Sequence, residues 1–276
     1  MDTEASAKQE ASLYYSDLGA WQGEPTVLNS GALLYCRESA AVLHINFQPW
    51  QLKAGDAIIL FPGDVVQVTG ASPQFRAEIL EYDASLLREA SIQLEHTVYS
   101  QLRADRCRGD SPVAGVVVGR IMDLLRVFFE TPGCTCTVGM TLLQLKGFFL
   151  GFYDYIQRNP DEAPLETESH RTVALFSTFM EMLAHNYRSR RDVAFYAGQM
   201  HISAKYLGTI VGRVTGHTCK AIIDHYVVMQ LKTHLRNSRQ NIKEIAWLYH
   251  FNDESFLCRY FKQHTGATPQ QYRKMM

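Results

Sequence analysis

The chain has 276 residues and a formal net charge of −1, with 46% hydrophobic and 20% charged residues. This composition is typical of a globular protein, and no apolar run approaches the roughly 20 residues that a membrane-spanning helix needs. The polar segment 1–12 lacks the apolar stretch of a signal peptide, so we expect a cytoplasmic protein whose six scattered cysteines are free thiols.

Charge is unevenly distributed along the chain. Residues 170–276 carry 15 Lys and Arg against 6 Asp and Glu, a balance of +9, whereas residues 1–169 have a balance of −10. Eight of the ten histidines also lie in the basic part. This split predicts a C-terminal part that binds nucleic acid and an N-terminal part that avoids the phosphate backbone.

The first part of the chain has the pattern of short strands. Residues 22–83 are rich in β-branched and aromatic residues, with apolar runs at 42–47 and 57–61. Turn signals such as Gly55-Asp56 and Pro62-Gly63 separate these runs, which favours a β-sandwich or barrel. We therefore expect a tail at residues 1–21 and a barrel at residues 22–83.

From residue 84 to 158 the apolar period becomes helical. Two apolar stretches, 113–130 and 138–157, flank Thr131-Pro132-Gly133 and predict an antiparallel helix pair. The first helix is apolar on more than one face, so it is a candidate dimer interface, and packing within the chain is the alternative. Residues 159–169 contain two prolines and four acids, which indicates an exposed linker.

The last segment, residues 170–276, is helical and repeats itself. Thr215-Gly216-His217-Thr218 is echoed by residues 265–268, and each motif follows a helix that has an apolar stripe and is preceded by a shorter helix. The second helices of the two pairs lie 50 residues apart, whereas the first helices lie 49 residues apart. The turn inside the second pair therefore holds one extra residue. The expected inward stripe is Tyr206, Leu207, Ile210, Val211 and Val214, repeated as Phe256, Leu257, Tyr260, Phe261 and His264. Such helix pairs predict two helix-turn-helix units.

Capping residues mark where these helices begin. Ser203 precedes the second helix of the first unit, and Asn252 or Asp253 precedes that of the second. Thr218 is expected to cap a helix running to about Leu235, which at ~1.5 Å per residue spans about 26 Å. That spacer is comparable with the roughly 34 Å between successive major grooves. A protein-binding solenoid is the alternative, but solenoids usually need three or more repeats.

The second unit resembles the signature of the AraC/XylS family of transcription regulators. The stretches that carry the resemblance are Ile242–Ala246, Phe251–Phe256, Arg259–Lys262 and Gly266–Arg273, and it covers roughly residues 170–274. The resemblance implies a double helix-turn-helix domain that binds double-stranded DNA, a homodimer, and RNA polymerase as a further partner. The first unit departs from the pattern, because its reader positions are small or neutral: Ala204, Gly208, Thr209 and Gly212.

The face opposite each apolar stripe is left for DNA. The predicted contacts are Ser203, Lys205, Thr209 and Arg213 in the first unit, and Asn252, Asp253, Ser255, Arg259 and Lys262 in the second. Arg259 is the first candidate for base readout, because Arg bonds guanine through two donors in the major groove. Arg213 and Lys262 are expected to meet phosphates, which position the protein without specifying sequence.

Residues 52–64 are similar to the second motif of cupin barrels, and many AraC-like regulators carry a cupin-type domain that binds a small effector. We therefore predict an α+β chain with a cupin-like barrel, a helical dimerisation segment at 84–158 and an all-α C-terminal domain. Metal-using cupins place a histidine where this chain has Val65, Val66, Gln67 and Val68, so we expect no metal. The ligand-binding residues are unknown, and the candidates to line a pocket are Trp50, Phe47, Phe61, Tyr35 and Arg37.

Other functions are less well supported by the residues. A regulator whose N-terminal domain only dimerises and binds no ligand is the first alternative. An enzyme with a DNA-binding appendage would need a convergent acid–base or metal set, and the sequence shows none, so no catalytic residue and no cofactor are expected. Cys134-Thr135-Cys136 is too closely spaced for an ordinary zinc site.

Overall fold

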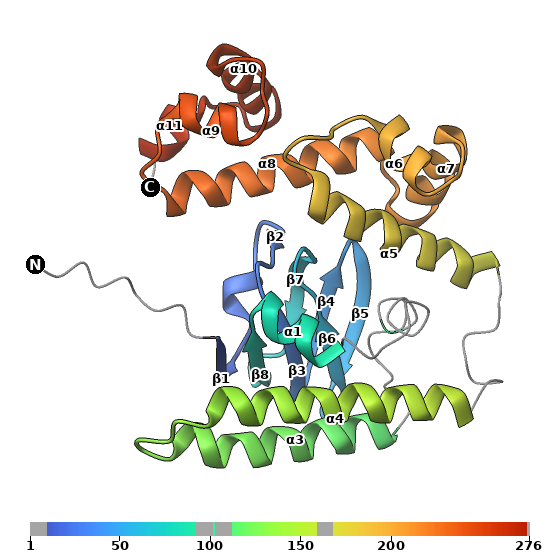
Figure 1. Cartoon of the computed structure of the whole chain (residues 1–276), viewed down its shortest axis with the longest axis vertical. Helices are drawn as coiled ribbons and strands as arrows, with labels where there is room; N and C mark the ends of the chain where they lie inside the picture. The colour runs from blue at the N-terminus through green and yellow to red at the C-terminus, as the bar shows by residue number, and fades with distance from the viewer. Residues whose placement is uncertain (1–9, 92–101, 103–111, 159–167, 275–276) are drawn as a thin grey trace, which may run out of the picture. The chain divides into compact units, whose positions relative to one another are not determined.

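The computed structural model describes residues 10–91, 102, 112–158 and 168–274, and Figure 1 shows the chain. Contacts within it divide the chain into two compact units, residues 1–174 and 175–276. The first combines two sheets with helices and the second is helical, which confirms the predicted α+β class. The predicted linker 159–169 falls largely outside the described residues.

Two four-stranded antiparallel sheets form the centre of the first unit. The strands are β1 (Ala11–Ser16), β2 (Thr26–Val27), β3 (Gly31–Glu38), β4 (Ala40–Ile45), β5 (Gln48–Lys53), β6 (Ala57–Leu60), β7 (Val65–Ala71) and β8 (Arg76–Tyr82), with a 3₁₀ turn η1 (Gly19–Trp21) after β1. The strand orders are β1-β8-β3-β6 in the first sheet and β2-β7-β4-β5 in the second. The two sheets face each other as a sandwich without closing into a single barrel.

Strand β1 lies inside the segment expected to be a tail. Its six residues pair with β8 from Ala11 opposite Tyr82 to Ser16 opposite Ala77, which makes β1 an edge strand. No turn signal precedes it in the sequence, and Tyr14 and Tyr15 stay largely exposed. Its strand conformation therefore depends on pairing with a distant segment, which local pattern does not reveal.

Alternating side chains of the first sheet serve two different cores. One face, with Leu34 and Ile79, packs against the second sheet, and the other face, with Leu33 and Leu80, packs against helices. These helices are α1 (Ala84–Ser91), α3 (Pro112–Glu130) and α4 (Thr137–Arg158), and the last two match the predicted helix pair. At Gly115 a Cβ atom would lie 2.1 Å from the carbonyl oxygen of Gly55, so only glycine lets α3 approach the β5–β6 turn this closely.

A buried carboxylate fixes α3 to the sheet. Glu78 of β8 is 1% exposed and accepts hydrogen bonds from Arg37 Nε at 2.8 Å and from Arg126 Nε at 3.0 Å. Asp123 of α3 also accepts from Arg37, at 2.8 Å. Burying a carboxylate is costly unless it is paired in this way, so α3 packs firmly within its own chain on this face.

The second unit is built around one long helix. Helix α8 (Cys219–Asn237) buries most of its residues, and Figure 1 shows it running between two groups of shorter helices. The others are α5 (Glu168–Asn186), α6 (Val193–Gln199), α7 (Ala204–Thr215), α9 (Ile242–Leu248), α10 (Glu254–Thr265) and α11 (Pro269–Lys274). The side chain of Thr218 accepts from Ala221 N, which confirms the predicted cap of α8. No helix in the described ranges is long and apolar enough to cross a membrane.

Candidate nucleic-acid interface

The two helix pairs, α6–α7 and α9–α10, share one turn geometry. Three backbone hydrogen bonds close each turn, and the two sets are offset by 49 residues: Met200 N to Tyr196 O, His201 N to Gly198 O and Ile202 N to Ala197 O, then Tyr249 N to Ile245 O, His250 N to Trp247 O and Phe251 N to Ala246 O. The middle residue of each set is left-handed, with φ of 54° at His201 and 50° at His250. Left-handed backbone is strained for a residue with a Cβ, so both turns keep the same conformation against a local cost.

After the turn the offset becomes 50 residues. Ser203 Oγ accepts from Tyr206 N at 3.1 Å, and Asp253 Oδ1 accepts from Phe256 N at 2.6 Å. Asp253 is therefore the cap of α10, and Asn252 is the extra residue of the second turn, as the offsets predicted. Each helix then ends at a left-handed glycine, Gly216 or Gly266.

The apolar stripe of each second helix is only partly buried. Its middle residues are buried in both units: Leu207, Ile210 and Val211, then Leu257 and Phe261. The predicted inward positions Tyr206 and Phe256 are instead 41% and 43% exposed, and His264 is also exposed. The expectation was wrong at these positions, which lie near the ends of α7 and α10, outside the buried middle of each helix.

The structure places all nine predicted DNA contacts on exposed positions: Ser203, Lys205, Thr209, Arg213, Asn252, Asp253, Ser255, Arg259 and Lys262. Ser203 and Asp253 already serve as caps through their side-chain oxygens. Thr209 Oγ1 donates to the carbonyl of Lys205 at 3.1 Å, so its hydroxyl has a partner within the helix.

Exposed aromatic residues beside this face were not predicted. Phe256 lies next to Arg259, whose guanidinium carbon is 5.8 Å from the centre of the ring. Trp247 on α9 is 80% exposed.

Contacts with α8 and with the loop before α6 hold the second helix pair, α9–α10, in place. Tyr260 of α10 donates to Asp224 of α8 at 2.8 Å, and burial together with that carboxylate raises the pKa of Tyr260. Arg191 precedes α6, donates to the carbonyl of Tyr249, and stacks at 3.8 Å from the ring centre of Phe251. Burial lowers the pKa of Arg191. These contacts tie α10 to the same scaffold that carries α7.

Comparisons with known proteins agree with this geometry. Residues 196–275, which run from α6 into the end of the chain, match the family model of a helix-turn-helix domain. The uncharacterized HTH-type transcriptional regulator YijO of Escherichia coli (strain K12) is 26% identical over 230 residues, which cover 81% of this chain and 77% of that protein.

Two solved structures are also similar. ToxT from Vibrio cholerae has a TM-score of 0.45 and 11% identity, with 96% of this chain and 98% of that chain covered. The C-terminal domain of the response regulator yesN from Fusobacterium nucleatum has a TM-score of 0.33 and 21% identity, with 34% and 93% covered. From the matched family model we conclude that residues 196–275 of this chain form a helix-turn-helix domain, and the chain as a whole is similar to a transcription regulator.

Proposed function

We propose that the protein reads a specific operator by placing α7 and α10 in successive major grooves. The observation that carries this proposal is the duplicated turn geometry, which presents the polar face of each second helix in the same way. Helix α8 has 19 residues and so is about 28 Å long, which is comparable with the roughly 34 Å between successive grooves.

The two helices have unequal roles in this proposal. Thr209 and Arg259 occupy equivalent positions, 50 residues apart, and only Arg259 can bond guanine through two donors. Arg259 reads a base, and Lys262, one turn further along, contacts a phosphate. In α7, Lys205 and Arg213 contribute mainly phosphate contacts, because Gly208 and Gly212 between them have no side chain to reach a base.

Helices α3 and α4 support a homodimer. Their exposed apolar residues are Val116, Val117, Leu124 and Val127 on α3 and Leu143 and Leu150 on α4. Beside the leucines lie Gly139, Gly147 and Gly151, where an added Cβ would meet nothing within 4 Å. A glycine inside a helix costs up to about 1 kcal/mol relative to alanine, and nothing in the described part of this chain requires these three to be small. A helix of a second copy packed against α4 would require small residues at these three positions.

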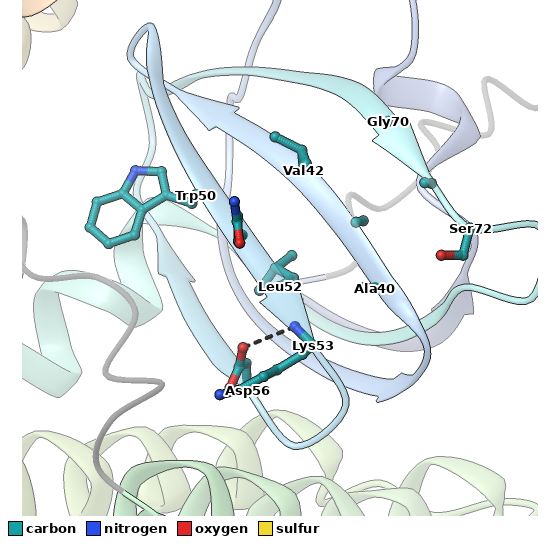
Figure 2. A pocket seen from close by; sticks show the side chains of 11 residues that line it. Ala40, Val42, Trp50, Leu52, Lys53, Asp56, Gly70 and Ser72 are labelled. Carbon is teal, nitrogen blue, oxygen red and sulfur yellow. Dashed lines mark hydrogen bonds between the residues drawn. The ribbon is translucent and has the colours of Figure 1, made fainter.

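A candidate effector site is a groove of about 610 Å³ across one end of the second sheet. Trp50 and Lys53 of β5, Val42 of β4 and Gly70 of β7 line it, as Figure 2 shows. Its lining combines an indole, aliphatic side chains, the ammonium group of Lys53 and the carboxylate of Asp56, a mixture that suits a small amphipathic ligand. The other pocket candidates lie elsewhere: Phe61 and Tyr35 pack against the helices, Arg37 bonds Glu78, and Phe47 lies in the turn between β4 and β5.

The second candidate function is a regulator whose first unit dimerises and takes no ligand. Its support is the interior of the sandwich, where Leu34, Leu43, Ile58 and Val66 are fully buried against one another. Thermal-shift screening of the full chain against a metabolite library, followed by titration of each hit against Trp50→Phe, separates the two. A hit that loses its shift in the variant supports the groove, and the absence of any hit favours the second candidate.

Footprinting of the full chain on its own genomic DNA tests the operator proposal. We expect protected sites that share a motif with two conserved blocks about one helical turn apart, and stronger sequence preference in one block. Protection with no shared motif would contradict the proposal, because it would indicate binding through the phosphate backbone alone.

A further inference from the structure

The turn between α3 and α4 brings two cysteine sulfurs together. Cys134 Sγ and Cys136 Sγ are 3.4 Å apart, with Cys136 exposed and Cys134 half-buried. The backbone holds them there: Cys134 N donates to Thr131 O at 3.2 Å, and Cys136 O accepts from Met140 N at 2.8 Å in the first turn of α4. Gly133, with a φ of 76°, makes the sharp bend just before the pair.

A zinc site does not explain this arrangement. Structural zinc takes four ligands, and the described residues contain no group of three or more His, Cys, Asp and Glu that could hold a metal ion. Two accessible thiols in contact have a simpler chemistry, since together they supply the two electrons that reduce one disulfide bond.

The other described cysteines lack this combination. Burial raises the pKa of Cys36 to about 11 and that of Cys219 to about 12, so neither is a ready thiolate. Cys258 on α10 is half-exposed, and it has no second sulfur within hydrogen-bonding distance among the residues that the structure describes. The α3–α4 turn is therefore the place where a dithiol reaction is set up by geometry.

We propose that Cys134 and Cys136 form a thiol–disulfide exchange site that takes low-molecular-weight disulfides of the glutathione type. In the first step the thiolate of one cysteine attacks a sulfur of the small disulfide, a mixed disulfide forms, and one small thiolate leaves. In the second step the neighbouring cysteine, as a thiolate, attacks the protein sulfur of the mixed disulfide and expels the second small thiolate. Two protein thiols become one disulfide, the small disulfide becomes two thiols, and the two protein protons end on the released thiolates.

Either cysteine can resolve a mixed disulfide formed by the other, because the two sulfurs lie 3.4 Å apart. Exposed disulfides have less reducing potentials than buried structural ones, so this pair would stay reduced in a reducing cytosol and close as the pool of small disulfides becomes oxidised.

Peptide mapping of the full chain tests the proposal. The reduced protein is incubated with oxidised glutathione, quenched with acid, alkylated with iodoacetamide and digested with trypsin. Both cysteines lie in the peptide that follows Arg126 and ends at Lys146, and no other cysteine does. We expect this peptide to lose two hydrogens, to carry neither alkyl group nor glutathione, and to recover both alkylation sites after treatment with dithiothreitol.

Single variants separate exchange from simple oxidation. Cys136→Ser and Cys134→Ser are each expected to accumulate glutathione on the remaining cysteine, since the resolving sulfur is gone. Cys258 in the same digest serves as the internal control for an unpaired thiol. A wild-type peptide that keeps glutathione, that stays alkylated while Cys258 reacts, or that joins two chains on a non-reducing gel would overturn the proposal. Circular dichroism confirms that each variant is folded.

Discussion

The two helix-turn-helix units have the same backbone and different reading surfaces. Both turns have the same three hydrogen bonds, both second helices are capped by a side-chain oxygen, and both end at a left-handed glycine. Yet the position of Arg259 in α10 is Thr209 in α7, and that of Lys262 is Gly212. In the proposed docking, the backbone geometry that presents a helix to DNA is therefore separable from the side chains that read it. Five sets of substitutions test this separation, and all but Lys262→Ala compare equivalent positions of both units.

The shared core is the first feature to test. Leu207→Ala and Leu257→Ala each remove a side chain with 0% and 1% exposure from equivalent positions. We expect each to lower the free energy of unfolding by about 2–5 kcal/mol, because a buried cavity forms. Urea denaturation of the full chain followed by circular dichroism measures this. A loss in one unit several times that in the other would mean that the cores are not equivalent.

Arg259→Ala tests the difference in reading. It should weaken binding to the best operator by about 1–3 kcal/mol and relax discrimination at one base pair, since it removes two donors to guanine. Thr209→Ala is the matched substitution in the first helix-turn-helix pair, and we expect it to lower operator affinity less. A mobility-shift titration at fixed salt measures both. Wild-type affinity of Arg259→Ala for the best site would show that the proposed docking of α10 is wrong.

Lys262→Ala provides the contrast for a phosphate contact. We expect weaker binding to all sequences alike, and a salt dependence that falls by about one unit of slope, because about one fewer counterion is released. Titrations at several salt concentrations, on the operator and on unrelated DNA, measure this. Loss restricted to the operator would instead place Lys262 against a base.

The caps are expected to behave alike in the two units. Ser203→Ala and Asp253→Ala each leave a helical N–H without its side-chain acceptor, which costs about 0.5–2 kcal/mol of stability. Thermal unfolding of the full chain measures the loss. Ser203→Asp should restore stability, because aspartate caps the equivalent helix. Failure of Ser203→Asp to do so would show that the two N-termini differ.

The smallest expected effect is a gain in stability at the turns. His201→Gly and His250→Gly remove a Cβ from left-handed backbone, which relieves about 1–2 kcal/mol, offset by about 0.5–1 kcal/mol from the greater freedom of glycine in the unfolded chain. The net gain should be small and positive in both units. Loss of stability in either variant would show that the imidazole makes contacts that offset the strain.

Local features of the sequence predicted most of the helical part of the chain, residues 175–276. The offsets of 49 and 50 residues located the extra turn residue, and the caps at Ser203, Thr218 and one of two candidates in the second unit were found from residue type alone. These predictions succeed because a helix, its cap and its closing glycine depend on neighbours within a few residues. The exposure of Tyr206 and Phe256 was missed, since burial near the end of a helix depends on tertiary packing and not on the local apolar pattern.

The sequence by itself determined the class of the protein, the duplicated DNA-binding domain and the exposed face that would meet DNA. Only the tertiary structure decided that β1 pairs with β8, that Glu78 is held by Arg37 and Arg126, and that two sheets form the sandwich. The pairing of β1 with β8 and the contacts of Glu78 join residues 41 to 71 positions apart in the chain, so no local periodicity encodes them. Pairing across such distances is set by the packing of the whole unit.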